Sequence, residues 1–331
     1  MRRSAGRMAT ATQPRVLNWL GGLVAVCLLG GGACTLRAAE TPETPTQVIP
    51  DVAYLADDRV EKLDLYLPAP PAAGVKSPAL VWIHGGGWMG GTKNEARAKN
   101  ICTTLANAGY VAVSIDYRLG AGAWPTNLHD CKNAVRFLRA NAGKYRLDPE
   151  RIAVAGGSAG GHLALMVALT GGLAELEPVG AATPYPGVSS AVRCGVNFYG
   201  ITDVPAWRVK PKAGEPAPAN LLRDSTAKVY GVASLEAPVL RLASPITHVK
   251  ASSVPLLTLH GRSDETVELA QAETLDRVAK ERGARHELIV LDGIGHTFDL
   301  ERWGKKPLPR DLRPVFLEFL VKHLGKEGVR E

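Results

Sequence analysis

A serine flanked by glycines is the strongest chemical signal in the chain. Residues 156–160 read Gly-Gly-Ser-Ala-Gly; they follow Arg151–Ala155, a short run of β-type residues, and precede His162–Leu169, which has the composition of a helix start. A G-x-S-x-G turn between a strand and a helix leaves no room for flanking side chains and strains the serine. It predicts that Ser158 presents a nucleophilic hydroxyl at the end of a sheet. The alternative is a glycine-rich turn with an incidental serine, so the prediction depends on a base, an acid and oxyanion donors elsewhere.

The oxyanion donors are predicted in a second glycine-rich stretch. Residues 84–88 read His-Gly-Gly-Gly-Trp and directly follow Leu80–Ile83, an apolar strand. Acyl transfer passes through an oxyanion that needs backbone N–H donors, and glycines let the main chain approach a substrate closely. We predict the N–H groups of Gly86, Gly87 and Ala159 as donors. Phosphate binding is the other use of such loops, but the chain has no G-K-[ST] and no G-x-G-x-x-G opening a helix.

The general base is predicted to be His296. It follows the strand-like run His286–Leu291 late in the chain, and glycines on its N-terminal side favour an open turn. His84 and His162 adjoin the two glycine motifs and are better explained as structural. The other histidines have no motif around them: His129, His248, His260, His286 and His323.

The acid that orients the base is predicted to be Asp264. It follows the strand-like run Leu256–Leu259, where its carboxylate would hold the imidazole and stabilise imidazolium. Glu265 is the neighbouring alternative. Other acidic residues near strand ends or near His296 are expected to serve as turn or loop ligands: Asp203, Asp292 and Asp299.

Composition and charge favour a globular protein with no nucleic-acid partner. The chain has 331 residues, 46% of them hydrophobic, and a formal net charge of +7. Five arginines and no acidic residue lie in residues 1–39; the remainder holds 34 basic and 32 acidic side chains. The basic excess therefore belongs mostly to the N-terminal segment, and no basic face is evident elsewhere.

Residues 1–39 are predicted to be a signal peptide or an N-terminal anchor. Arginines come first, the apolar run Trp19–Ala33 follows, and the small residues Ala38 and Ala39 come next. The run is short for a membrane span, which needs about 20 apolar residues, yet an uncleaved anchor stays open. We expect export to the periplasm or beyond, with membrane contact only through this segment. Residues 40–50, rich in Thr and Pro, are predicted as a linker.

The cysteines indicate neither a disulfide framework nor a metal site. Cys102, Cys131 and Cys194 lie beyond the N-terminal segment, an odd number with no C-x-x-C spacing. We expect three buried, inert thiols, and no metal or organic cofactor is implied.

Residues 51–326 are predicted to form one α/β domain. Two alternating segments, Asp51–Leu55 and Val60–Leu67, predict a hairpin that turns at Asp57-Asp58. Strand-like and helix-like segments then alternate, which predicts a mostly parallel sheet of about eight strands with helices on both faces. The further expected strands are Ala79–Ile83, Tyr110–Ile115, Arg151–Ala155, Arg193–Phe198, Pro255–Leu259 and His286–Leu291; the expected helices are Asn94–Ala108, Leu128–Ala142, Thr266–Arg282 and Leu312–Leu324, besides the one opening at His162.

Two long segments interrupt this alternation. Gly171–Ser190 and Pro205–Pro245 are rich in Pro, Gly and Ala, and we expect both to leave the sheet on its ligand-binding side and form a cap. Trp88, Trp124 and Trp207 are candidate walls of the substrate pocket, with ordinary core as the alternative.

Together these stretches resemble the α/β-hydrolase superfamily, and within it the H-G-G-G-W esterases, most nearly the bacterial feruloyl- and acetylxylan-esterase-like proteins. The resemblance rests on residues 84–88, 114–119, 148–152, 156–161, 198–200, 260–264 and 295–296. The chain order Ser158, Asp264, His296 is that of α/β-hydrolases. By this resemblance, Asp116, Tyr117 and Arg118 would brace the oxyanion loop. Gly157 departs from the acidic residue usual in hormone-sensitive-lipase-like esterases.

The resemblance implies a serine esterase acting through an acyl-enzyme, on acetyl or feruloyl esters of carbohydrates or similar small esters. Amidases and peptidases of the same fold, arylformamidase-like or prolyl-oligopeptidase-like, are the alternative within the class. A non-catalytic binding module is the alternative outside it, and it predicts a missing triad member where the sequence supplies all three.

Overall fold

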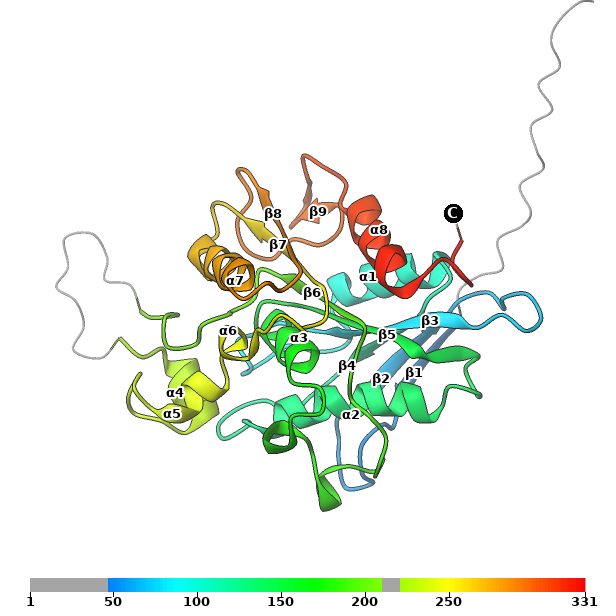
Figure 1. Ribbon diagram of the computed structural model, residues 1–331, viewed down its shortest axis with the longest axis horizontal. Helices are drawn as coiled ribbons and strands as arrows, with labels where there is room; N and C mark the ends of the chain where they lie inside the picture. The colour runs from blue at the N-terminus through cyan, green and yellow to red at the C-terminus, as the bar shows by residue number, and fades with distance from the viewer. Residues whose placement is uncertain (1–46, 210–220, 331) are drawn as a thin grey trace, which may run out of the picture. The chain divides into compact units, whose positions relative to one another are not determined.

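The computed structural model describes residues 47–209 and 221–330. Their central feature is an eight-stranded sheet in the order β1-β2-β4-β3-β5-β6-β7-β8, shown in Figure 1. The first two strands pair antiparallel with each other and with β4, and every other neighbouring pair is parallel. The strands are β1 (Gln47–Val52), β2 (Leu63–Leu67), β3 (Ser77–Ile83), β4 (Val111–Ile115), β5 (Leu147–Gly157), β6 (Cys194–Phe198), β7 (Leu256–Gly261) and β8 (His286–Leu291). A separate two-stranded sheet pairs β9 (Arg302–Trp303) with β10 (Lys306–Pro307).

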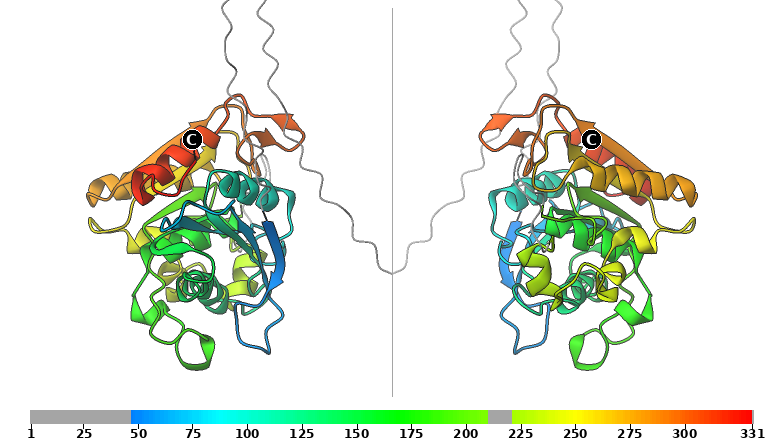
Figure 2. Two further views of the ribbon diagram at one scale, coloured as in Figure 1. Left: turned by 90° about the vertical axis from the view of Figure 1, so that its right-hand side faces the viewer. Right: turned by 90° about the vertical axis from the view of Figure 1, so that its left-hand side faces the viewer.

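Helices cover both faces of this sheet, as Figures 1 and 2 show. Two of them, α1 and α8, pack on one core, and α2, α3 and α7 pack on the other. The helices are α1 (Ala96–Asn107), α2 (Thr126–Ala140), α3 (Ala159–Leu169), α4 (Asp224–Tyr230), α5 (Pro238–Leu242), α6 (Pro245–His248), α7 (Leu269–Glu281) and α8 (Arg313–Leu324), with 3-10 turns at Ala174–Leu176 and Gly180–Ala182.

The strand sequences explain why the sheet lies between two layers. All seven residues of β3 are buried. Because side chains alternate across a strand, Val81 and Ile83 enter one core while Leu80 and Trp82 enter the other. A strand that is apolar on both faces is stable only where helices cover both sides, as in parallel sheets. This layering places the carboxyl ends of β3, β5, β7 and β8 at one edge.

The expected α/β fold is confirmed, with differences at its boundaries. Strand β1 begins at Gln47, inside the range predicted as a linker, because these residues pair with Leu63–Leu67. The linker prediction is therefore wrong over 47–50, and the hairpin pairs earlier residues than expected. The signal peptide or anchor prediction for 1–39 lies outside the described residues. The strand His286–Leu291 has the bounds predicted for it.

The prediction that both insertions cap the ligand side is wrong for Gly171–Ser190. This segment follows α3 and precedes β6, so it lies at the amino edge of the parallel strands, opposite Ser158. Residues 205–209, at the start of the second segment, follow the carboxyl end of β6 and lie on the expected side. A loop's side is set by whether it enters or leaves a parallel strand, which composition does not reveal.

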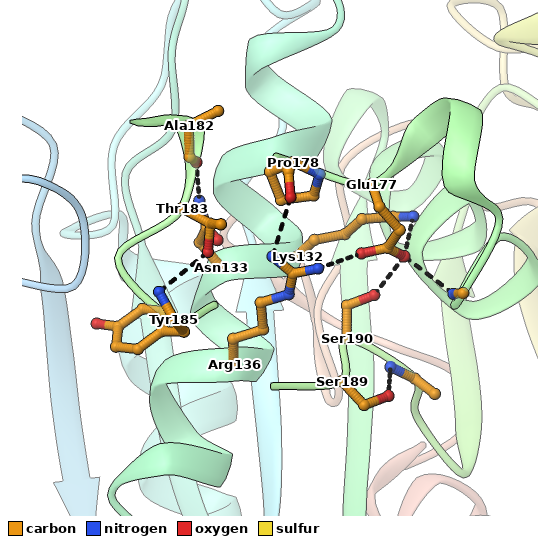
Figure 3. A network of polar contacts seen from close by, with 12 residues as sticks. Lys132, Asn133, Arg136, Glu177, Pro178, Ala182, Thr183, Tyr185, Ser189 and Ser190 are labelled. Carbon is orange, nitrogen blue, oxygen red and sulfur yellow. Dashed lines mark hydrogen bonds and ion pairs between the residues drawn. The ribbon is translucent and has the colours of Figure 1, made fainter. Parts of the chain in front are cut away.

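A buried ion network fixes the 171–190 segment to α2 (Figure 3). Glu177 accepts hydrogen bonds from Lys132 Nζ at 2.7 Å and from Arg136 at 2.7 Å. Its Oε1 also accepts from the Ser190 hydroxyl at 2.6 Å and the Gly172 N–H at 2.9 Å. Burial raises the pKa of Glu177, but these donors outweigh it and hold the pKa below its ordinary value. Burial lowers the pKa of Lys132, whose side chain is fully enclosed, against the pull of Glu177.

Removing this carboxylate should destabilise the fold. Glu177→Gln leaves Lys132 and Arg136 buried without their counter-charge, so we expect the free energy of unfolding in urea to fall by about 3 kcal/mol. Glu281→Gln is the matched control, because Glu281 and Arg277 are both more than half exposed, and we expect a change below about 1 kcal/mol. Equal losses in the two variants would contradict this role for Glu177.

Candidate active site

Ser158 lies at the turn between β5 and α3, in a backbone conformation that L-residues rarely adopt. Its φ is 57° and its ψ is −122°. Neighbouring glycines permit this turn, since a Cβ at Gly160 would overlap the carbonyl oxygens of Ile83 and His84, and a Cβ at Gly156 would overlap the Gly160 carbonyl. The strained serine is therefore held by direct backbone contact between the turn and the end of β3.

The three residues predicted for the triad meet at this edge of the sheet. His296 Nε2 lies 2.9 Å from Ser158 Oγ, and His296 Nδ1 lies 2.6 Å from Asp264 Oδ2. The Asp264 side chain is fully buried, and that of His296 is 13% exposed. This geometry allows the imidazole to accept the serine proton while the carboxylate fixes the ring and its tautomer.

The carboxylate is itself held by the turn that follows it. Asp264 Oδ1 accepts hydrogen bonds from the backbone N–H groups of Thr266 and Val267, both at 2.9 Å. Glu265, the alternative acid, is exposed. The other acidic candidates bind elsewhere, Asp292 to Arg262, Asp299 to its own turn, and Asp203 to the Ala206 N–H.

The oxyanion loop, residues 84–91, lies directly against the serine turn. A Cβ at Gly85 would lie 2.9 Å from the Gly157 carbonyl oxygen and 3.2 Å from Ser158 Cβ. The Gly86 carbonyl accepts from the N–H groups of Met89 and Gly90. The N–H groups of Gly86 and Gly87 donate to no other group in the described part of the chain. Ala159 is the first residue of α3, where N–H groups have no helical partner.

Two of the three predicted bracing residues hold this loop. The Tyr117 hydroxyl donates to the His84 carbonyl at 3.0 Å, and its ring stacks on the His84 imidazole at 4.4 Å. The Asp116 carboxylate accepts from the Lys93 N–H at 2.8 Å, just beyond the loop. Arg118 instead joins Glu61 in a separate ion network. Asp116 and Tyr117 thus fix the loop from the neighbouring strand end.

Tyr199 is a site residue whose role the sequence did not reveal. It is fully buried, its ring packs edge-on against His296 at 4.8 Å, and its hydroxyl donates to the Phe298 carbonyl at 2.8 Å. It thereby fixes the loop that carries the base. A Cβ at Gly157 would lie 3.0 Å from the Tyr199 hydroxyl, which gives a local reason for glycine there. The sequence signals are that Tyr199 follows directly on a predicted strand end and lies in residues 198–200, one of the stretches that carry the resemblance.

Two of the tryptophans predicted as pocket walls are core residues. Trp88 is 0% exposed and Trp207 5%, and their rings pack edge-on at 5.6 Å. Trp124 is half-buried and packs against Tyr230 at 5.4 Å. Trp88 of residues 84–91 thus packs directly on Trp207, and through Tyr230 it is linked to Trp124.

The described residues also bear on the expectations for metal ligands, membrane-spanning helices and cysteines. Within 47–209 and 221–330, no three His, Cys, Asp or Glu side chains gather as metal ligands, and no helix is long and apolar enough to cross a membrane. Cys102, Cys131 and Cys194 are free and buried, as expected.

The parallel sheet, the glycine-flanked serine turn and the Ser–His–Asp arrangement define the α/β-hydrolase class. Within it, the chain belongs to the BD-FAE family, whose model matches residues 63–278. It is similar to the probable carboxylic ester hydrolase LipM of Mycobacterium tuberculosis, with 31% identity over 255 residues, which cover 76% of this chain and 56% of LipM. The chain thus spans about half the length of this curated relative.

Solved structures with the same fold are also similar over most of the chain. A truncated form of a carbohydrate esterase from gut microbiota has a TM-score of 0.69 and 26% identity, and the match covers 86% of this chain and 98% of that one. Thermogutta terrifontis esterase 2 phosphorylated by paraoxon has a TM-score of 0.62 and 25% identity, and the match covers 86% and 95%.

The loop geometry predicts different costs for two adjacent glycines. Gly86→Ala would force a Cβ into the Gly90 carbonyl at a φ of 110°, so we expect the free energy of unfolding to fall by more than about 2 kcal/mol. The Cβ of Gly87→Ala meets nothing within 4 Å, and its φ of 60° alone should lower the free energy of unfolding by about 1 kcal/mol. Chemical denaturation of both variants measures this difference, and a larger loss for Gly87→Ala would contradict it.

The buried imidazole of His162 should make stability depend on pH. Burial lowers its pKa to about 4, although Nε2 donates to the Ala243 carbonyl at 2.7 Å. The pKa is lower in the folded than in the unfolded state, so this contribution is complete above about pH 6.5 and is lost as the pH falls toward 4. We expect the titration of His162 to lower the free energy of unfolding by about 2 kcal/mol between about pH 7 and pH 5. Unfolding free energies across this range should fall less steeply for His162→Gln; an unchanged slope would contradict this.

Proposed function

We propose that the protein is a serine esterase that hydrolyses carboxylic esters through an acyl-enzyme on Ser158. The observation that carries this proposal is the continuous hydrogen-bond chain from Ser158 Oγ through both His296 nitrogens to Asp264. The named ester hydrolases among its relatives support the same reaction. It requires only this chain's residues and water.

The reaction follows from the atoms in contact. Ser158 Oγ attacks the ester carbonyl carbon while His296 Nε2 takes its proton, and the adjacent Asp264 carboxylate stabilises the imidazolium. The C–O bond to the alcohol breaks as His296 returns the proton to the leaving oxygen. Water, deprotonated by His296, then attacks the acyl-enzyme, releasing the acid and restoring the Ser158 hydroxyl.

The oxyanion of both tetrahedral intermediates would be held by the N–H groups of Gly86, Gly87 and Ala159. The two glycine donors are not used within the described fold, and Ala159 adds the unpaired N–H of a helix start. Preorganised donors of this kind stabilise charge that appears only in the transition state. Tyr117 and Asp116 keep the loop in position for this task.

The substrates we propose are acetyl or feruloyl esters of carbohydrates, or similar small esters. The support is the likeness to a carbohydrate esterase from gut microbiota and the export-type segment at residues 1–39, which would place the enzyme outside the cytoplasm. Fractionation of cells that produce the full chain tests this location, and activity confined to the cytoplasm would contradict it.

Ester hydrolysis by the full chain should depend on Ser158. We expect turnover of p-nitrophenyl acetate and methyl ferulate, and a loss of at least about 1,000-fold in kcat for Ser158→Ala, because the nucleophile is removed. Ser189→Ala, at the opposite edge of the sheet and exposed, is the control and should keep the wild-type rate.

The ratio of the two ester rates distinguishes small from aromatic acyl groups. No serine-dependent turnover of either ester, together with turnover of an N-formyl aromatic amine, would replace the esterase with an amidase. Full ester turnover by Ser158→Ala would overturn the mechanism.

A further inference from the structure

The turn that carries the catalytic acid is held from outside by two buried ring N–H groups. We define the acid turn as residues 264–267. Its N–H groups at Thr266 and Val267 bind Asp264 Oδ1, and its carbonyls at the same two residues each accept a side-chain hydrogen bond. Trp207 Nε1 donates to the Thr266 carbonyl at 2.9 Å, and His260 Nε2 lies 2.7 Å from the Val267 carbonyl. The peptide unit between Thr266 and Val267 is therefore held at both ends, at its N–H by Asp264 and at its carbonyl by Trp207, and His260 holds the carbonyl of the next unit.

Trp207 reaches the acid turn from the segment that follows β6. It is 5% exposed, its ring packs edge-on against Trp88 of the oxyanion loop at 5.6 Å, and the Arg223 guanidinium lies over the ring, 4.4 Å from its centre. Arg223 in turn reaches Glu268, just beyond the turn, at 4.0 Å. One side chain of the segment after β6 thus contacts both the oxyanion loop and the acid turn.

His260 reaches the same turn from the end of β7. It is fully buried, and its Nε2 lies 3.5 Å from Asp264 Oδ2, the oxygen that binds His296. Burial lowers the pKa of His260, against the pull of the Val267 carbonyl and Asp264. The ring is therefore a neutral donor through Nε2. Its N–H helps to hold Val267 and faces the Asp264 carboxylate. Because the ring is neutral, it adds no positive charge beside the His296 imidazolium that forms in the reaction.

We propose that Trp207 and His260 are positioning residues that clamp the acid turn and thereby hold the Asp264 carboxylate in line with His296. The proposal rests on the proposed function, because it assigns these residues a task only if Asp264 acts in the reaction. Neither residue touches the reacting atoms. Their effect must therefore pass through Asp264, and this makes the proposal testable.

Kinetics of the full chain with p-nitrophenyl acetate test the clamp in two backgrounds. Trp207→Phe keeps a buried ring but removes the N–H, and we expect kcat to fall about 10-fold with KM within about two-fold. The kcat of His260→Leu should fall by a similar factor. His260→Gln keeps an N–H donor, so its kcat should stay close to that of the wild type. In the Asp264→Asn background, each substitution should change kcat by less than about two-fold, because residues that act through one group are not additive.

His286→Leu is the matched control. The variant also removes a buried imidazole with two partners, Asp276 on α7 and Thr258 on β7. We therefore expect it to lower stability while leaving kcat within about two-fold of wild type. Unchanged kcat in Trp207→Phe and in both His260 variants would overturn the clamp. The same fold-loss with and without Asp264 would also overturn it, since that result indicates general structural support. Full turnover by Ser158→Ala and Asp264→Asn would instead overturn the proposed function itself.

Discussion

The structure depends on the direct backbone contact between the end of β3 and the serine turn. Gly160 lies so close to the Ile83 carbonyl that no side chain fits between them. This contact fixes the distance from Ser158 to the oxyanion loop, because the loop continues from β3 and the serine directly follows the neighbouring strand β5. The parallel pairing of these two strands, buried on both faces, supplies the rigidity that a strained serine requires.

A glycine also allows close backbone contact where the segments of Asp264 and His296 approach each other. A Cβ at Gly261, the last residue of β7, would overlap the Ile294 carbonyl and lie 2.7 Å from the Gly295 carbonyl oxygen. The end of β7, three residues before Asp264, is thus in backbone contact with the loop that carries His296, and this contact holds the two side chains within reach of their 2.6 Å hydrogen bond. Tyr199, which follows β6 between the strands that carry the serine and the acid, packs edge-on against the imidazole.

Local chemistry made most of this site predictable from the sequence. Ser158 and Gly86 stand in short motifs whose glycines are required by close backbone contacts. His296 and Asp264 follow strands in a fixed chain order. The side on which residues 171–190 lie follows from their place between a helix and the next parallel strand, which composition alone does not give. The role of Tyr199 and the contacts that hold residues 171–190 were not predictable, because they join segments far apart in the sequence: Tyr199 with the His296 loop, and Glu177 with Lys132 of α2. Periodicity and composition carry no record of such contacts.

The most direct test of the account is to trap the covalent intermediate. The protein would be mixed briefly with p-nitrophenyl acetate, quenched in acid, digested and analysed by mass spectrometry. The account predicts one acetyl group per chain on the peptide that contains Ser158, accumulating with the first release of p-nitrophenol. Acetyl groups on another residue, or turnover while Ser158 stays unmodified throughout, would contradict it.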